Sequence, residues 1–245
     1  MKIVLLGYGK MGQQIEQFAL KRGHEIQLIV DKDNRASIMA ADLSEADVAI
    51  DFSEPAAAIH NISLCFEANL PIVVGTTGWY DHLDEIKSVC EEADQSLLYG
   101  SNFSIGVNVF FHVNRLLAKA MAPYKQYDVQ VEEIHHIHKL DSPSGTAITI
   151  AEGILDGVED KSKWINNLVG EGEELVPKAD ELLIESHRID EVPGTHTVLY
   201  SSEVDQIEFK HTAHSRAGFA LGAVVAAEWL RGKKGFYQVT EMFNF

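Results

Sequence analysis

The first hundred residues alternate short apolar runs with segments whose apolar positions recur every three to four residues. The runs predict buried strands, and the segments predict amphipathic helices. The expected strands at 2–6, 25–30, 47–50, 71–74 and 96–99 are interspersed with expected helices at 10–21, 56–68 and 81–93. Alternation at this spacing is typical of βαβ units built around a parallel sheet.

The pattern changes after residue 104. A long helix is expected at 105–121, and it is followed by strands at 128–134, 181–187, 195–200 and 204–210. Because few helices lie between these strands, we expect a mostly antiparallel sheet that is open on one face. The polar, weakly periodic stretch 157–180 reads as a long excursion, and the strongly apolar helix at 218–230 is expected to pack back on the first domain.

A glycine-rich turn follows the first expected strand and opens the first helix. Its sequence is Gly7-Tyr8-Gly9-Lys10-Met11-Gly12, a G-x-G-x-x-G pattern. The first glycine permits a tight turn, the second lets the backbone approach a pyrophosphate, and the third lets helix and strand pack closely. The free N–H groups of the helix would then meet the phosphates. We interpret the turn as a dinucleotide site; the alternative is a glycine turn in an α/β domain that binds no nucleotide.

The residues after the second strand bear on the choice of cofactor. Asp31 lies 19 residues after Gly12, where a carboxylate can accept hydrogen bonds from the ribose of NADH and repel the 2′-phosphate of NADPH. Lys32 and Arg35 follow at once and could instead reach that phosphate, or be solvated surface cations. Two later turns, Asp51-Phe52-Ser53 and Gly75-Thr76-Thr77-Gly78, end strands at the edge where such sheets bind ligands.

The most unusual stretch places three histidines and a lysine within five positions: His135-His136-Ile137-His138-Lys139. Nearly consecutive histidines at a strand end point to different faces, so we expect no metal site. A solvated polar loop is the plain alternative. The functional interpretation is an anion site with proton donors, because histidine titrates near neutral pH and lysine holds carboxylates. Ser144-Gly145-Thr146 then opens a helix whose N–H groups suit a carboxylate, and the whole predicts a small di-acid substrate.

Composition narrows the classes of function. The chain of 245 residues is 46% hydrophobic and carries a net charge of −17, which favours a packed enzyme and disfavours nucleic acids or membrane surfaces as partners. No apolar run approaches the ~20 residues of a membrane span. The run after Lys2 ends at Gly7, too short for a secretory signal, so we expect a cytoplasmic protein. Two cysteines make no disulfide framework.

Four segments together resemble one enzyme family. The glycine turn, the Gly75–Gly78 turn, the stretch Ser101-Asn102-Phe103-Ser104-Ile105-Gly106-Val107-Asn108 and the stretch from His135 through Pro143-Ser144-Gly145-Thr146-Ala147 are similar to signatures of 4-hydroxy-tetrahydrodipicolinate reductases. That family acts in the diaminopimelate route to lysine. The resemblance implies an α/β fold, a Rossmann-type doubly wound parallel sheet at 1–106 and 217–245. The inserted mixed α+β domain, at 107–216, would bind substrate and build a homotetramer.

The resemblance also implies roles for individual residues. His135 matches the proton donor and acceptor, Lys139 the proton donor, and His136, Gly145 and Thr146 the substrate contacts. The implied contacts to NADH or NADPH are Gly7, Tyr8, Gly9, Lys10, Met11, Gly12, Asp31, Lys32, Gly75, Thr76, Thr77, Tyr99, Gly100, Ser101 and Asn102. The implied reaction is reduction of 4-hydroxy-tetrahydrodipicolinate to tetrahydrodipicolinate with loss of water.

The chain departs from the family pattern at two places. Ser142 stands where alanine is usual, a change we expect to be tolerated, and Asp190 stands where glycine is common. If that turn needs a positive φ, aspartate can adopt it at small cost.

Two other functions stay open. One is another two-domain dehydrogenase acting on a semialdehyde or small acid, and the other is a non-catalytic NAD-binding sensor. A phosphorylating semialdehyde dehydrogenase needs a nucleophilic cysteine, whereas Cys65 lies in an apolar helical segment and Cys90 in a helix expected at the surface. A sensor would need no histidine–lysine cluster.

Overall fold

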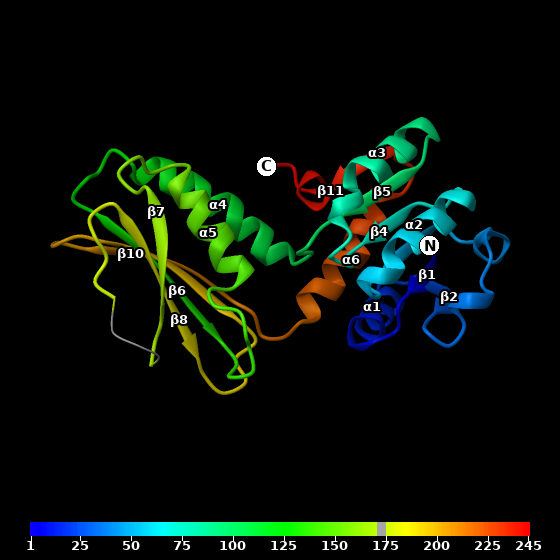
Figure 1. The fold of residues 1–245 in the computed structure, drawn as a ribbon, viewed down its shortest axis with the longest axis horizontal. Helices are drawn as coiled ribbons and strands as arrows, with labels where there is room; N and C mark the ends of the chain where they lie inside the picture. The colour runs from blue at the N-terminus through cyan, green and yellow to red at the C-terminus, as the bar shows by residue number, and fades with distance from the viewer. Residues whose placement is uncertain (171–174) are drawn as a thin grey trace. The chain divides into compact units, whose positions relative to one another are not determined.

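The computed structural model describes residues 1–170 and 175–245. These residues form two compact units (Figure 1): Met1–Ile105 with Ala217–Phe245, and Gly106–Arg216. The chain thus leaves the first unit once and returns to it once.

The first unit is built on a six-stranded sheet in which every neighbouring pair is parallel. Its strands are β1 (Lys2–Leu6), β2 (Glu25–Val30), β3 (Val48–Asp51), β4 (Ile72–Val74), β5 (Ser96–Tyr99) and β11 (Gly235–Gln238). Their order is β11-β5-β4-β3-β1-β2, so the direction of winding reverses between β1 and β3. Sheets of this kind bind ligands at the carboxyl ends of the strands at such a reversal.

Helices cover both faces of this sheet. Helices α1 (Lys10–Lys21) and α6 (Ala217–Leu230) share a core with Ile3 and Leu5 on one face. Helices α2 (Pro55–Glu67) and α3 (Leu83–Glu92) share a core with Val4 and Leu6 on the other. Successive residues of a strand point to opposite faces, which is why the apolar residues 3–6 of β1 serve both cores. The expected return of the apolar helix to the first domain is confirmed.

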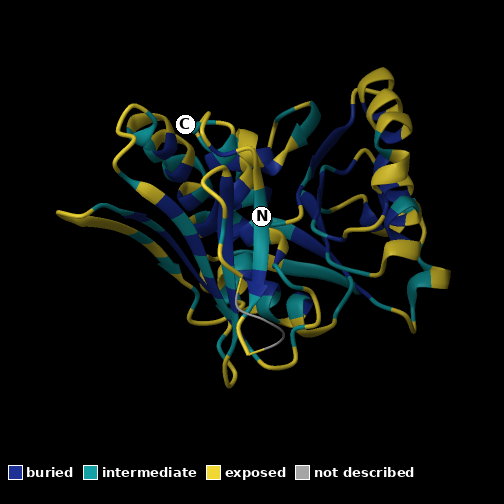
Figure 2. Cartoon of the chain, turned by 60° about the vertical axis from the view of Figure 1, so that its left-hand side comes forward, coloured by how far each residue is buried: buried dark blue, intermediate teal, exposed yellow. Residues whose placement is uncertain are grey.

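The second unit has a five-stranded sheet with its helices on one face. The elements are α4 (Ile105–Met121), β6 (Asp128–His135), α5 (Gly145–Leu155), β7 (Lys163–Leu168), β8 (Glu181–Arg188), β9 (Thr195–Ser201) and β10 (Gln206–Thr212). Apolar residues of both helices pack with inward-facing residues of the sheet such as Val131, Ile184 and Val198. Among the described residues of this unit, no helix packs on the opposite face. Figure 2 shows how little of the edge strand β10 is buried.

Three expectations need correction. The order β10-β9-β6-β8-β7 is mixed rather than mostly antiparallel, because β6 pairs with β8, and β8 with β7, in parallel. The expected excursion at 157–180 contains β7, whereas its residues 171–174 lie outside the described part of the chain. The C-terminal strand β11 was not predicted; it extends the first sheet beside β5.

Within the described residues, four short 3-10 helices connect the larger elements: Arg35–Ser37, Ala40–Leu43, Tyr80–His82 and Val239–Met242. None of the described helices combines the length and the apolar character needed to span a membrane.

Candidate active site

The first unit has a cavity of about 330 Å³ at the reversal between β1 and β3. Its walls are the turn after β1, the end of β2 with the residues that follow, and the turn between β3 and α2. They comprise Gly7, Tyr8, Gly9, Val30, Asp31, Lys32, Arg35, Phe52, Ser53, Glu54 and Asn61. The glycine turn and the acidic residue predicted from the sequence therefore meet in one cavity.

The three glycines of the turn have different steric environments. Gly7 has φ +95°, and a β-carbon there would lie 2.3 Å from the carbonyl oxygen of Phe52. A β-carbon at Gly12 would lie 2.3 Å from the carbonyl oxygen of Gly7, so this glycine permits the contact between turn and helix. At Gly9 a β-carbon would meet nothing within 4 Å. The backbone at Gly9 is thus open to a ligand, and the turn fits the pyrophosphate of a dinucleotide.

Asp31, Lys32 and Arg35 all line this cavity. The Asp31 carboxylate accepts a hydrogen bond from the backbone N–H of Asp33 at 2.8 Å, and its own N–H donates to the side-chain oxygen of Asn34 at 2.8 Å. These bonds hold a carboxylate and two cations at one wall. The wall can therefore serve a free ribose hydroxyl and a 2′-phosphate.

Lys10, Met11 and Gly12 lie in the first turn of α1, and the other predicted cofactor residues lie at the ends of β4 and β5 or just after them; none of these residues lines that cavity. Thr76 is 5% exposed, and its hydroxyl accepts a hydrogen bond from the N–H of Ser53 at 2.7 Å, tying the ends of β3 and β4 together. Its hydroxyl is therefore engaged within the protein, whereas Thr77 is exposed. After β5, Gly100 lets Val239 approach closely, and the side-chain oxygen of Asn102 accepts from the N–H of Ser104.

In the second unit, β6 ends at the histidine cluster. The inward face of β6 carries Val129, Val131, Glu133 and His135, all of them buried. His138 points away and lies exposed, 3.0 Å from Glu191. The histidines thus take different directions, as strand geometry predicts.

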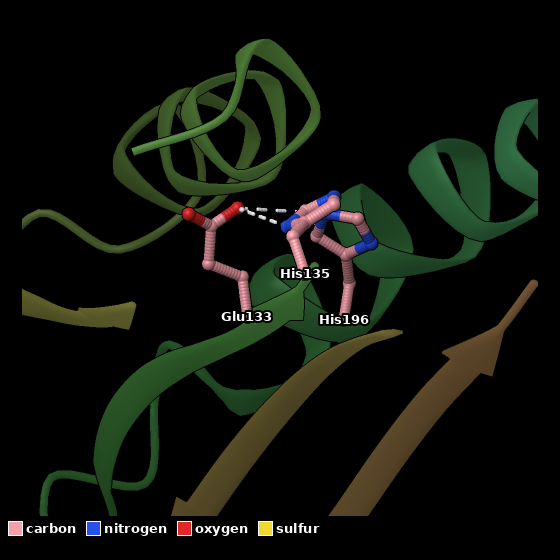
Figure 3. A group of neighbouring side chains, drawn as sticks. All are labelled: Glu133, His135 and His196. Carbon is pink, nitrogen blue, oxygen red and sulfur yellow. Dashed lines mark ion pairs between the residues drawn. The ribbon is translucent and has the colours of Figure 1, made fainter. Parts of the chain in front are cut away.

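Glu133 lies at the centre of a buried polar cluster with His135 and His196 (Figure 3). Oε2 of Glu133 lies 3.3 Å from Nδ1 of His135 and 3.8 Å from Nε2 of His196. Oε1 accepts a hydrogen bond from the hydroxyl of Ser186 at 2.8 Å, and the N–H of Ser144 donates to the same carboxylate at 3.1 Å. The carboxylate is 0% exposed, so these neighbours replace its hydration.

The charges of this cluster follow from burial and hydrogen bonding. Burial opposes ionisation of Glu133, but the side chains of His135, Ser144 and Ser186 outweigh it and lower the pKa of Glu133 to about 2. Burial, together with the neighbouring His135, lowers the pKa of His196 to about 3. At neutral pH the cluster therefore holds an anionic carboxylate and a neutral His196.

Lys139 lies on the loop that follows. Its ammonium group donates to both carboxylate oxygens of Asp141 at 2.8 Å, and this pairing lowers the pKa of Asp141. Arg188 at the end of β8 fixes the loop by donating to the carbonyls of Lys139 and Asp141, and it lies 3.5 Å from Glu133. The lysine and the buried cluster are thus joined through one guanidinium group.

Helix α5 begins next to the same cluster. Ser144 is its N-cap: the hydroxyl accepts from the N–H of Ala147 at 3.1 Å, as the sequence predicted. A β-carbon at Gly145 would meet nothing within 4 Å, and Thr146 is half-buried. The first turn of α5 therefore offers backbone N–H groups in open space, which suits a carboxylate.

The cluster also meets a geometric criterion for a metal site. The ligand atoms of Glu133, His135 and His196 lie within 4.8 Å of one another. However, the carboxylate already accepts from Ser144 and Ser186, and Nε2 of His196 lies 3.2 Å from the hydroxyl of Ser144. These contacts use the lone pairs that a metal would need, so we interpret the cluster as a hydrogen-bonded proton network.

Sequence reasoning did not select Glu133, His196 or Arg188 as site residues. Strand register brings them together: Glu133 pairs with His196 on β9 and with Ser186 on β8, while His135 pairs with Arg188. One signal was available, because Glu133 interrupts the apolar inward positions of β6. A carboxylate at such a position needs buried partners.

The two departures from the family pattern have local explanations. Asp190 has φ +42°, so the turn does require a positive φ and aspartate adopts it. Ser142 accepts a hydrogen bond from the side chain of Asn166 on β7 at 3.0 Å.

Both cysteines are buried. Burial raises the pKa of the Cys65 thiol, and it raises that of Cys90 to about 11. Cys90 is thus not a surface residue as expected. Neither thiol has the lowered pKa of a nucleophile.

A glycine turn at the reversal of a parallel sheet, in a chain whose second unit carries a buried cluster of two histidines and a carboxylate, is typical of a two-domain nicotinamide-dependent oxidoreductase. The comparisons with known proteins specify it further. The family model of the dihydrodipicolinate reductase N-terminus matches residues 1–103, and that of the C-terminus matches residues 106–243. The chain belongs to the dihydrodipicolinate reductase family, whose members are NAD(P)H-dependent enzymes of the diaminopimelate route to lysine.

Individual relatives agree with this assignment. The chain is 49% identical to the 4-hydroxy-tetrahydrodipicolinate reductase of Christiangramia forsetii, over 100% of this chain and 98% of the relative. It is 36% identical to that of Akkermansia muciniphila, over 96% and 94%. In fold it resembles a dipicolinate-bound dihydrodipicolinate reductase from Paenisporosarcina sp. TG-14, with a TM-score of 0.78, 23% identity and coverage of 99% and 100%.

Proposed function

We propose that this chain reduces 4-hydroxy-tetrahydrodipicolinate with His135 and Lys139 as its proton-transfer groups, and that His136, Gly145 and Thr146 bind the substrate. The observation that carries this proposal is the arrangement at the end of β6. There a buried histidine–carboxylate pair is linked through Ser144 to the open N-terminus of α5. This combination offers anion binding and proton transfer at one place, as a cyclic di-acid requires.

The cofactor belongs to the first unit. Gly7, Gly9 and Gly12 would hold its pyrophosphate, and Asp31, Lys32 and Arg35 its adenosine ribose or 2′-phosphate. The contacts implied at Thr77 and at Tyr99 to Asn102 lie along the same edge of the sheet, after β4 and β5. When bound, the reduced nicotinamide supplies the hydride that the substrate ring accepts.

The residues of the second unit transfer protons and bind the carboxylates of the substrate. Reduction adds a hydride and a proton to the ring, and elimination removes the hydroxyl group together with one ring hydrogen as water. Lys139 exchanges its Asp141 partner for a substrate carboxylate, and it donates a proton. The buried His135 exchanges a proton at the ring nitrogen that does not face Glu133. The N–H groups at the start of α5 hold a second carboxylate.

We further propose that the protein is a cytoplasmic homotetramer. The second sheet carries both of its helices on one face, and its other face includes partly buried residues such as Ile134 and Leu199. Association of four copies through this face would cover it. Two free cysteines suit a reducing compartment. Sedimentation velocity of the purified protein should give the mass of four chains, and a monomer would refute the tetramer.

The reaction is tested by following the absorbance of NADH or NADPH with enzymatically generated 4-hydroxy-tetrahydrodipicolinate. Cofactor consumption that depends on this substrate is expected. Aspartate semialdehyde and small 2-oxo acids serve as the comparison substrates for another dehydrogenase. Turnover of one of these alone, or NADH binding with no turnover of any of them, would contradict the proposal and favour the other dehydrogenase or the sensor.

A further inference from the structure

Glu133 has no reacting role in the function proposed above, yet it is the most enclosed charged group of the cluster. Its side chain is 0% exposed, on a strand face whose earlier inward residues, Val129 and Val131, are apolar. A buried carboxylate without compensation costs several kcal/mol of stability, so its position calls for an explanation in terms of its partners.

Those partners come from four elements. His135 lies on β6 itself, Ser186 on β8, His196 on β9, and Ser144 is the N-cap of α5. With Arg188 at 3.5 Å, they hold the carboxylate as an anion. A fixed anion with partners on several rigid elements is a suitable anchor for a proton-transfer group.

The anchor acts on one side of the His135 ring. Nδ1 is buried and lies 3.3 Å from Oε2 of Glu133, and among the described residues it makes no hydrogen bond. Because the nearby carboxylate is an anion, it favours the proton of the neutral ring on Nδ1. Nε2 then carries the free lone pair. A β-carbon at Gly194 would lie 3.1 Å from Nε2, so the absence of a side chain at this position keeps the second nitrogen uncrowded.

The same carboxylate also fixes the substrate cradle. It accepts from the N–H of Ser144, and the next two residues are Gly145 and Thr146 at the open start of α5. One group therefore sets the positions of the histidine and of the helix N-terminus relative to each other.

We propose that Glu133 is the positioning residue of this active site: it holds Nδ1–H of His135, leaves Nε2 to exchange the proton with the substrate, and fixes the start of α5. This inference rests on the function proposed for His135. It assigns Glu133 no contact with the substrate.

A double-mutant cycle tests the proposal on the full-length protein. Glu133→Gln keeps the size of the side chain and removes its charge, and we expect kcat to fall by about tenfold or more. In the His135→Ala background the same change should lower kcat by less than about twofold, because the histidine is no longer there to orient and the amide oxygen of glutamine can still accept from the N–H of Ser144. NADH affinity, which depends on the first unit, should stay unchanged in all variants.

The matched control is Glu181→Gln. Glu181 is also buried and ion-paired, with Lys163 at 3.1 Å, and it lies at the opposite end of β8 from Arg188. This variant should keep kcat within about twofold of the wild type even where it loses stability.

The outcomes separate the two proposals. Near-normal kcat in His135→Ala would refute the function proposed for His135. A large loss in His135→Ala combined with near-normal kcat in Glu133→Gln, or with additive losses, would overturn the role of Glu133 alone. A measurement on the wild type covers the case in which Glu133→Gln does not fold. The ring ¹⁵N spectrum of His135, recorded at alkaline pH on the neutral ring, should show the proton on Nδ1. A proton on Nε2 would overturn the inference.

Discussion

At the scale of single residues, Asp31 is the proposed partner of the adenosine ribose. Its carboxylate shares one cavity wall with Lys32 and Arg35. The account therefore predicts use of both cofactors, with NADH at least as effective as NADPH. Asp31→Ala should raise KM for NADH more than KM for NADPH. With NADH the change removes a hydrogen-bond acceptor for the ribose, whereas with NADPH it also removes the repulsion between the carboxylate and the 2′-phosphate. Steady-state kinetics with each cofactor measures this difference.

Asp33→Ala is the matched control for that change. Asp33 is exposed, lies two residues further along, and is not part of the cavity wall. It alters the net charge equally but should leave both KM values in place. A wild-type preference for NADPH of about a hundredfold, or 2.7 kcal/mol, would contradict the assignment.

Lys139 should affect binding and turnover together. Its ammonium group is paired with the carboxylate of Asp141, whose side chain is 62% exposed, so a substrate carboxylate can replace that partner. Lys139→Ala should therefore raise KM for the di-acid and lower kcat. Lys125→Ala, which removes an exposed lysine paired with Asp160, should change neither constant. A change in KM alone would remove Lys139 from the proton transfer.

The candidate site was only partly predictable at this scale. His135, Lys139 and Gly145 were selected from the sequence because they lie on one short, distinctive segment. His196 and Arg188 lie more than forty residues after that segment, and they reach Glu133 only through the register of β6 with β9 and β8. The register of two strands depends on how the whole strands pair, so it cannot be predicted from the sequence of one segment.

At the scale of elements, the turn between β1 and α1 allows a comparison of two glycines. Gly9→Ala adds a β-carbon that meets no protein atom, so the apo protein should keep its melting temperature while its affinity for NADH falls. Gly12→Ala forces a β-carbon to 2.3 Å from the carbonyl of Gly7, so it should lower the melting temperature as well. Thermal unfolding and fluorescence titration with NADH measure both effects. Equal melting temperatures for the two variants would contradict this interpretation.

The elements that escaped prediction are edge strands. β7 has the sequence Lys-Trp-Ile-Asn-Asn-Leu and lies at the edge of its sheet, where partial exposure permits two asparagines that strands otherwise disfavour. β11 has four residues and begins at Gly235, with φ +123°. Buried strands are predicted from alternating apolar and polar residues or from a continuous apolar run, and neither of these edge strands needs such a pattern.

At the scale of the molecule, the mixed second sheet shows how connections determine strand direction. A parallel pair requires a crossover, and a helix between two strands is the usual signal. α5 lies between β6 and β8, which pair in parallel, but with few helices between the strands the sequence favoured a mostly antiparallel sheet. β7 was not predicted, so its parallel pairing with β8 was not expected either. The first unit carries a helix in most of its connections, and five of its six strands, β1 to β5, were predicted correctly.

The stability of the second unit should depend on pH through its buried histidines. The pKa of His196 is lowered to about 3, so this ring stays neutral in the folded protein while the unfolded chain binds a proton near pH ~6.5. Burial lowers the pKa of the half-buried His211 in the same direction. The stability contributed by His196 is complete above pH ~6.5 and is lost as the pH falls, by up to about 1.4 kcal/mol per pH unit.

His196→Gln should therefore flatten the pH dependence of stability between ~6.5 and ~4.5, a window in which Glu133 is ionised in the folded state. Amide hydrogen exchange in β6 and β9, corrected for its intrinsic pH dependence, reports this slope. A slope equal to that of the wild type would mean that His196 is already charged in the folded protein.

The central claim is that the buried histidine at the end of β6 transfers the proton in this reaction. The most direct measurement is kcat of His135→Ala with 4-hydroxy-tetrahydrodipicolinate, on protein shown to be folded and to bind NADH normally. The account predicts a loss of about 10²–10⁴-fold, the range for a missing general acid–base group. A variant that keeps more than about a third of the wild-type kcat, far above the rate left without such a group, would contradict it.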